Sequence, residues 1–220
     1  MLIFAMDTCC KAATAAVVSD DMLLAQVALN NNMQHSQRMM PLVEQMFADL
    51  GLTPADIDLF AAAAGPGSFT GVRIGVSTVK AMAHAAGKPC AVVSTLEGLA
   101  CNVPYFDGLV CPILDARREQ VYTAVFRGGG RVLDDCAMLV SELLDSFADD
   151  NVLFLGDGIF PYRGVIEGAM GERAVFAPPH LNLNLASSVA AVALGMARRG
   201  ELVGYSELVP NYVRLSQVGV

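Results

Sequence analysis

Three short apolar runs separated by polar positions open the chain and predict three β-strands. The runs cover residues 2–6, 12–18 and 23–29, and Asp20 and Asp21 form a polar turn between the second and the third. Residues rich in Val, Leu, Ala and Phe within runs of this length are typical of strands that pack against a core. The chain is therefore predicted to begin as strand, turn, strand, turn and strand.

The apolar spacing then changes to that of a helix. Residues 36–50 place Met, Val, Phe and Leu three and four positions apart, and Gly51 and Pro54 follow as stop signals. The segments beyond this helix alternate in type. The sequence predicts a strand at 57–64, a helix at 70–86 and a strand at 90–94.

The second half of the chain repeats this order. Asp7 follows the first strand of the first half, and Asp115 follows the first strand of the second half, so the two carboxylates occupy equivalent places. The predicted strands are 110–114, 120–127, 131–139 and 152–155, and the predicted helices are 141–147 and 186–199. Internal duplication of this kind predicts two α/β lobes of related topology with mixed sheets.

We place the lobes at residues 1–103 and 104–220, with the extreme C-terminus expected to pack back on the first lobe. Two related lobes with an Asp at the end of the first strand resemble the duplicated fold of actin, hexokinase and Hsp70, called ASKHA. In that superfamily the turn after the first strand approaches nucleotide phosphates. The resemblance therefore makes Asp7, Thr8, Gly65 and Gly67 candidate nucleotide contacts.

The most distinctive motif is Gly-Pro-Gly-Ser-Phe-Thr-Gly-Val-Arg, residues 65–73, between a predicted strand and a predicted helix. Two interpretations are open. A glycine-rich turn before a helix presents free backbone N–H groups that bind anions. Alternatively, Gly71 and Gly75, one helical turn apart, let another helix approach closely. We favour close packing, because a turn of this kind alone is weak support for phosphate binding.

Charge and cysteine usage exclude several classes of protein. The net charge is −8, from 14 basic and 22 acidic residues, so long-range repulsion opposes independent binding to nucleic acid. The sequence has six cysteines without a Cys-x-x-Cys pair, which favours free thiols in a cytoplasmic protein over a zinc site. The start of the chain lacks a basic leader, and no uncharged run is long enough to span a membrane.

Taken together, the motifs are similar to those of the TsaB (YeaZ) family. The similarity spans nearly the whole chain and departs from the family at Cys9, where Ser is usual. It rests on Asp7-Thr8, His35-Ser36 with Pro41, Gly65–Arg73, Ser94–Ala100, Asp115-Ala116-Arg117 with Glu119 and Tyr122, and Pro210 with Tyr212 and Arg214. The resemblance implies a non-catalytic subunit that dimerises with TsaD and works with the ATPase TsaE. That machinery attaches threonylcarbamoyl to adenosine 37 of tRNA, and tRNA is expected to be reached only through the complex.

The catalytic relative TsaD carries a His-x-x-x-His pair, whose members share one helix face and bind one metal ion. The matching positions here are Thr95 and Leu99, so we expect no metal site and no catalytic residue. Glu97 remains, but a lone carboxylate at a helix start is more often a partner of the helix terminus. The chain is expected to have no cofactor of its own, while ATP and a metal ion belong to partner subunits.

The helices at 36–50 and 70–86 are the predicted partner surface, since small residues permit close approach and Met side chains adapt to a partner. The candidate contacts are Met39, Met46, Gly71, Gly75, Thr78 and Met82. Each Met has the alternative of filling a gap in the core. Two other functions stay open: an ATP-binding enzyme of the same fold, either a kinase or a TsaD-like transferase, and a homodimeric regulator that uses the same surface.

Overall fold

The computed structural model describes residues 1–30 and 35–213, and the side chains of residues 35–37 are not part of that description. Two compact units divide the chain. The first comprises Met1–Gly98 and Asn184–Asn211, and Leu99–Leu183 belong to the second. Within the described residues no helix is long and apolar enough to cross a membrane.

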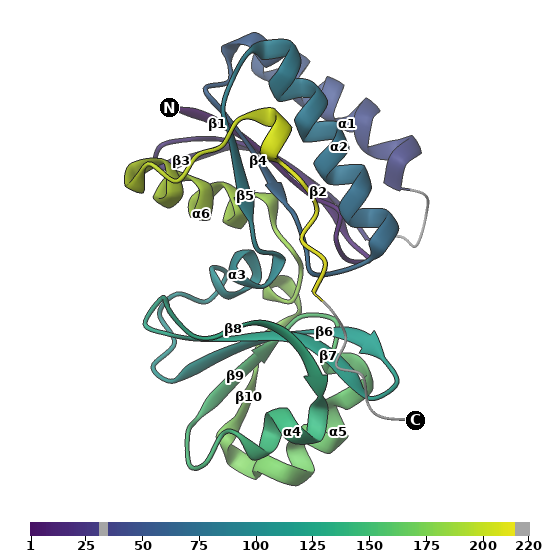
Figure 1. Ribbon diagram of the computed structural model, residues 1–220, viewed down its shortest axis with the longest axis vertical. Helices are drawn as coiled ribbons and strands as arrows, with labels where there is room; N and C mark the ends of the chain where they lie inside the picture. Colours follow the sequence, from purple (N-terminus) through teal and green to yellow (C-terminus); the bar gives the residue numbers. More distant parts are fainter. Residues whose placement is uncertain (31–34, 214–220) are drawn as a thin grey trace. The chain divides into compact units, whose positions relative to one another are not determined.

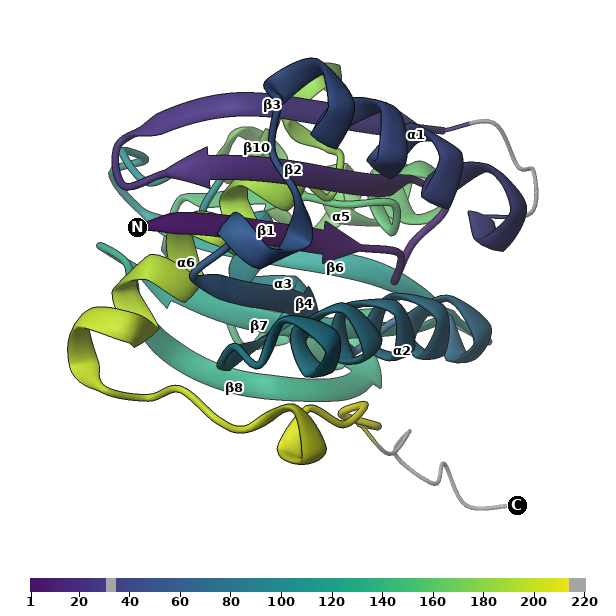
Figure 2. The same ribbon diagram turned by 90° about the horizontal axis from the view of Figure 1, so that it is seen from above.

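A five-stranded mixed sheet is the centre of the first unit. Strands β1, β2 and β3 form an antiparallel meander, and β4 and β5 extend it by parallel pairing on the other side of β1 (Figure 2). The sheet order is therefore β3-β2-β1-β4-β5. The strands are β1 (Leu2–Asp7), β2 (Ala13–Ser19), β3 (Met22–Leu29), β4 (Leu59–Ala63) and β5 (Cys90–Val93).

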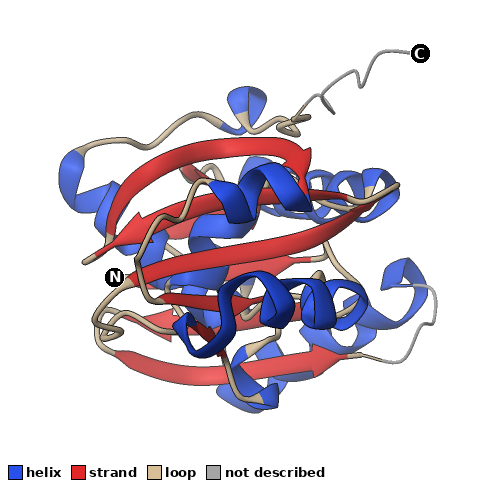
Figure 3. Cartoon of the chain, turned by 90° about the horizontal axis from the view of Figure 1, so that it is seen from below, coloured by secondary structure: helices blue, strands red, loops and turns tan. Residues whose placement is uncertain are grey.

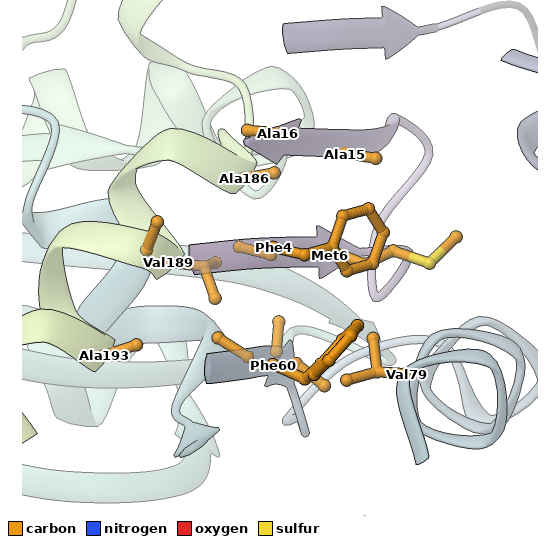
Figure 4. Packing of buried hydrophobic residues seen from close by; sticks show 14 of the residues in the cluster. Phe4, Met6, Ala15, Ala16, Phe60, Val79, Ala186, Val189 and Ala193 are labelled. Atoms are coloured by element: carbon orange, nitrogen blue, oxygen red, sulfur yellow. The ribbon is translucent and has the colours of Figure 1, made fainter. Parts of the chain in front are cut away.

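Helices cover both faces of this sheet. Helices α1 (His35–Leu50) and α2 (Phe69–Ala86) lie on one face, and α6 (Ala186–Arg199) lies on the other (Figure 1). Aromatic rings fill the first interface, because the Phe4 ring centroid lies 5.6 Å from that of Phe47 and 5.9 Å from that of Phe60. Small side chains of α6 fill the second. Val79 of α2 and Val189 and Ala193 of α6 accordingly approach the strands from opposite directions (Figure 4).

The second unit repeats the sheet with the same connectivity, in the order β8-β7-β6-β9-β10. Figure 3 shows the strands of the chain in red and the helices in blue. In each sheet the first three strands in chain order are antiparallel neighbours, and the last two pair in parallel beside the first strand. The duplicated α/β fold predicted from the sequence is confirmed. The elements are β6 (Leu109–Arg117), β7 (Gln120–Arg127), β8 (Gly130–Leu139), α4 (Val140–Asp145), β9 (Val152–Leu155), α5 (Ile159–Met170) and β10 (Ala174–Phe176).

Helix α5 and strand β10 were not among the predicted elements. Pro161, Gly164 and Gly168 weaken the helical signal of α5, although Pro is tolerated in the first turn, where its missing N–H has no partner to lose. Strand β10 has only three residues, which is too short for a periodic pattern. A short helix, α3 (Thr95–Ala100), follows β5 directly.

The expected lobe boundary differs from the one that the structure shows. Helix α6 was placed in the second lobe, yet its buried residues Val189, Ala190 and Ala193 pack on β1, β2 and β5 of the first unit. The chain then stays with that unit: Cys90 N–H donates to the Val203 carbonyl at 2.9 Å, and Asn211 N–H donates to the Ala64 carbonyl at 2.7 Å. The chain returns to the first unit because the second face of its sheet is apolar, and α6 buries that face.

Candidate functional site

The turn after β1 and the first half of α2 meet at Thr8. The Thr8 hydroxyl donates a hydrogen bond of 2.6 Å to the Gly71 carbonyl. A Cβ atom at Gly71 would overlap the Thr8 carbonyl oxygen, and one at Gly75 would lie 2.6 Å from the Thr8 hydroxyl oxygen. The two glycines therefore let α2 pass directly against the backbone of this turn, and the predicted placement of Gly71 and Gly75 at a partner surface is wrong.

Gly65 and Gly67 likewise pack against this chain's own backbone. Gly65 has a φ of +111°, which favours glycine, and a Cβ there would overlap the Asn211 carbonyl oxygen. A Cβ at Gly67 would overlap the carbonyl oxygen of Cys9, which also accepts the Ser68 N–H at 2.7 Å. The favoured interpretation of the motif is close approach by another helix, but the neighbours that the structure shows are backbone and turn atoms of this chain at Thr8, Cys9 and Asn211. Nucleotide contact at these residues remains a prediction.

Asp7 is fully buried at the end of β1. Its two oxygens accept the Cys9 N–H at 2.8 Å and the Asn184 side-chain amide at 3.0 Å. Burial raises the pKa of the Asp7 carboxyl, and the hydrogen bonds from Cys9 and Asn184 oppose that shift. Asp115 makes the equivalent bond in the second unit, where it accepts the Arg117 N–H at 2.9 Å. Asp7 and Asp115 therefore each stabilise, by hydrogen bonds, the turn that follows the first strand of their unit.

Asp7 should make the stability of the protein depend on pH. A folded-state pKa above the ordinary value of 3.8 means that the folded form holds the proton more tightly, so this stabilisation is present at acid pH and lost as the pH rises through the raised pKa. In Asp7→Asn the group cannot ionise, and Asn184 can present its amide oxygen instead. The free energy of unfolding of Asp7→Asn, relative to wild type, is expected to increase from about pH 4 upward and then level off.

Urea denaturation of both proteins across this range measures that difference. Asp21→Asn is the matched control, because Asp21 is an exposed carboxylate of the same unit. A relative stability of Asp7→Asn that stays constant with pH would show that Asp7 ionises equally well in the folded and unfolded chain.

Helix α3 carries the positions that match the metal-binding histidines of TsaD. Thr95 and Leu99 are both 0% exposed. A Leu side chain cannot bind a metal, and the Thr95 hydroxyl is buried in the structure. Within residues 1–30 and 35–213, moreover, no three His, Cys, Asp or Glu side chains gather in a way that would hold a metal ion.

Two of the predicted methionine contacts, Met39 and Met46, need correction, and that of Met82 stays a prediction. Met39 and Met46 are 1% and 4% exposed and fill the space between α1 and the sheet, because they lie on the apolar stripe that also carries Val43 and Phe47. Met82 is partly buried and packs on the same core. Thr78, another of the six candidates, is half-buried and lines a hollow on the outward face of α2.

The outward face of α2 carries an open hollow of about 470 Å³. Phe69 is 57% exposed at its rim, and the Arg73 guanidinium lies 3.8 Å from the centre of the Phe69 ring. Sequence reasoning missed Phe69 and Arg73, although their spacing of four residues puts them side by side on α2, next to the stripe of buried valines. The lining residues are Phe69, Thr70, Arg73, Ile74, Ser77 and Thr78.

Comparison with known proteins gives consistent matches. The profile of the family described as "TsaD: tRNA N6-adenosine threonylcarbamoyltransferase" matches residues 23–200. The tRNA threonylcarbamoyladenosine biosynthesis protein TsaB of Bacillus subtilis (strain 168) is 33% identical over 223 residues, covering 99% of this chain and 96% of the relative. YeaZ from Pseudomonas aeruginosa superposes with a TM-score of 0.82 at 26% identity and covers 96% of this chain and 99% of that chain.

A more distant structure has the same fold. Component A of (R)-2-hydroxyglutaryl-CoA dehydratase from Acidaminococcus fermentans gives a TM-score of 0.54 at 11% identity. The duplicated sheet topology and these matches define a protein of the actin/hexokinase/Hsp70-like ATPase fold. Within that class, the chain belongs to the TsaB (YeaZ) family of tRNA threonylcarbamoyladenosine biosynthesis.

Proposed function

We propose that this chain is a non-catalytic subunit that dimerises with TsaD through the outward face of α2. Together with the ATPase TsaE, the pair would transfer threonylcarbamoyl to adenosine 37 of tRNA in the cytoplasm. The observation that carries the proposal is the hollow of about 470 Å³ on α2 with the exposed Phe69 at its rim. In this role the chain acts by positioning a partner.

The chemistry of that face suits a protein partner. It combines an exposed aromatic ring, a stacked guanidinium and short hydroxyl side chains, and aromatic residues and Arg are enriched at protein interfaces. Gly71 and Gly75 serve this face indirectly, because they anchor the opposite side of α2 against Thr8. A helix fixed on one side presents its other side with little loss of entropy on binding.

The buried Thr95 and Leu99 support the non-catalytic assignment, since a TsaD-like metal centre would need imidazoles at both positions. The net charge of −8 supports tRNA contact through the complex rather than by this chain alone. We infer that ATP and the metal ion belong to the partner subunits. When TsaD is absent, the same exposed face of α2 would favour self-association.

Reconstitution with TsaD and TsaE tests the proposal. Each of the three proteins is omitted in turn, and every mixture contains tRNA, ATP and an activated threonylcarbamoyl donor. The complex is sized by analytical ultracentrifugation, and modified adenosine is measured in the tRNA. We expect a complex of this chain with TsaD, and tRNA modification only when all three proteins are present. Failure to bind TsaD, or threonylcarbamoyl transfer by this chain alone after removal of contaminants, would refute it.

A further inference from the structure

The turn between β6 and β7 has an unusual backbone. Arg117, Arg118 and Glu119 have φ angles of 70°, 50° and 61°, and in the part of the chain that the structure describes they are the only residues other than glycine with positive φ. In this region the Cβ atom of any residue other than glycine is crowded against backbone oxygen, so three successive residues with these φ angles need support from the surrounding structure. Backbone strain of this kind tends to persist where a surrounding structure holds it for a function.

Four hydrogen bonds supply that support, one within the turn and three with other segments of the chain. Asp115 accepts the Arg117 N–H at 2.9 Å and the Tyr162 hydroxyl at 3.3 Å. The Asp115 N–H in turn donates to an Asp157 carboxylate oxygen at 3.1 Å. On the far side of the turn, the Val140 N–H donates to the Glu119 carbonyl at 3.0 Å. The turn is therefore held at both ends, and Arg118 stands at its centre in a fixed backbone.

Arg118 differs from the other arginines of its unit. Acidic residues outnumber basic ones in Leu99–Leu183, and the remaining arginines have partners. Arg118 is exposed, and among the described residues its side chain has neither a hydrogen bond nor an ion pair. The partnered arginines are Arg117 with Asp115, Arg127 with Asp150, Arg131 with Asp135, Arg163 with Glu167 and Arg173 with the Phe147 carbonyl.

We propose that Arg118 contacts a backbone phosphate of tRNA when this chain is part of its complex. The inference rests on the proposed function, because the chain's own net charge of −8 opposes a stable contact outside a complex. A guanidinium donates two parallel N–H bonds to one phosphate, and a fixed turn lowers the entropy lost when the contact forms. The Glu119 carboxylate on the same turn repels further phosphates, which limits the contact to a single group.

Two variants of the full chain test this proposal. Arg118→Gln removes the guanidinium, and Arg127→Gln is the matched control, because it removes one charge from an exposed arginine of the same unit. Affinity for TsaD is measured first, and tRNA binding to the resulting complex is then measured over a range of KCl concentrations. We expect Arg118→Gln to weaken tRNA binding about three- to tenfold and to reduce the salt slope by about one ion, and we expect the control to change neither.

The two proposals fail in different ways. If the wild-type chain does not bind TsaD, the proposed function is wrong. If the complex forms and binds tRNA, but Arg118→Gln matches the control in affinity and salt slope, the phosphate contact is wrong. Weaker TsaD binding by Arg118→Gln with unchanged tRNA affinity would assign the residue to a protein contact and would overturn the inference as well. Glu119→Gln, which removes the repelling carboxylate, is expected to strengthen tRNA binding.

Discussion

Gly71→Ala is expected to destabilise the first unit by about 3 kcal/mol or more, at the upper end of the range for overpacking a tight site. The new Cβ would overlap the Thr8 carbonyl oxygen, which belongs to the backbone and cannot rotate away. Relief requires α2 to move off the turn after β1, and that movement also breaks the 2.6 Å hydrogen bond from the Thr8 hydroxyl. By calorimetry, the unfolding temperature should fall by about 6–12 °C.

Gly164→Ala is the matched control for this prediction. Gly164 lies inside α5, and a Cβ there meets no atom within 4 Å. Because Gly in a helix interior costs about 0.5–1 kcal/mol relative to Ala, this substitution should leave the unfolding temperature unchanged or raise it slightly. Equal effects of the two substitutions would mean that α2 is not seated on Thr8.

Phe69→Ala is expected to weaken binding to TsaD about 30- to 150-fold, the effect of losing about 2–3 kcal/mol at an interface hot spot. The ring is 57% exposed in the chain alone, so its removal should change the unfolding temperature little. It also supports the Arg73 guanidinium, which would lose its 3.8 Å stacking contact. Isothermal titration calorimetry with TsaD and a thermal melt of the same variant measure both quantities.

Tyr105→Ala serves as the control, since Tyr105 is a 97% exposed aromatic residue of the second unit. An unchanged affinity for Phe69→Ala, or an equal loss for Tyr105→Ala, would remove α2 as the docking surface. A substitution at Gly75 cannot test whether α2 is the docking surface. Any side chain there would meet the Thr8 hydroxyl and would disturb the fold before it affected binding.

The regular elements and the duplication were predicted well because local rules control them. Alternating apolar runs, Gly51 and Pro54 as stop signals, and Asp7 and Asp115 at matching places are all visible along the chain. Helix α5 was not predicted, because its Pro and two glycines lower its helix propensity. It is stable because Ile159, Ile166 and Met170 pack on the core of the second unit. Tertiary burial overrides weak local propensity in such cases.

For the candidate site, the sequence by itself determined the family, the missing histidines at Thr95 and Leu99, and the importance of the glycine motif. Only the tertiary structure decided what the glycines face. Helical spacing shows that Gly71 and Gly75 share a side of α2, but it does not say whether that side meets a partner or the chain itself. The contact with Thr8 joins residues far apart in sequence, and it turns Phe69 and Arg73 outward. Long-range packing of this kind has no signature in a local pattern, which is why the proposed docking face and the fixed turn that carries Arg118 emerge only from the folded chain.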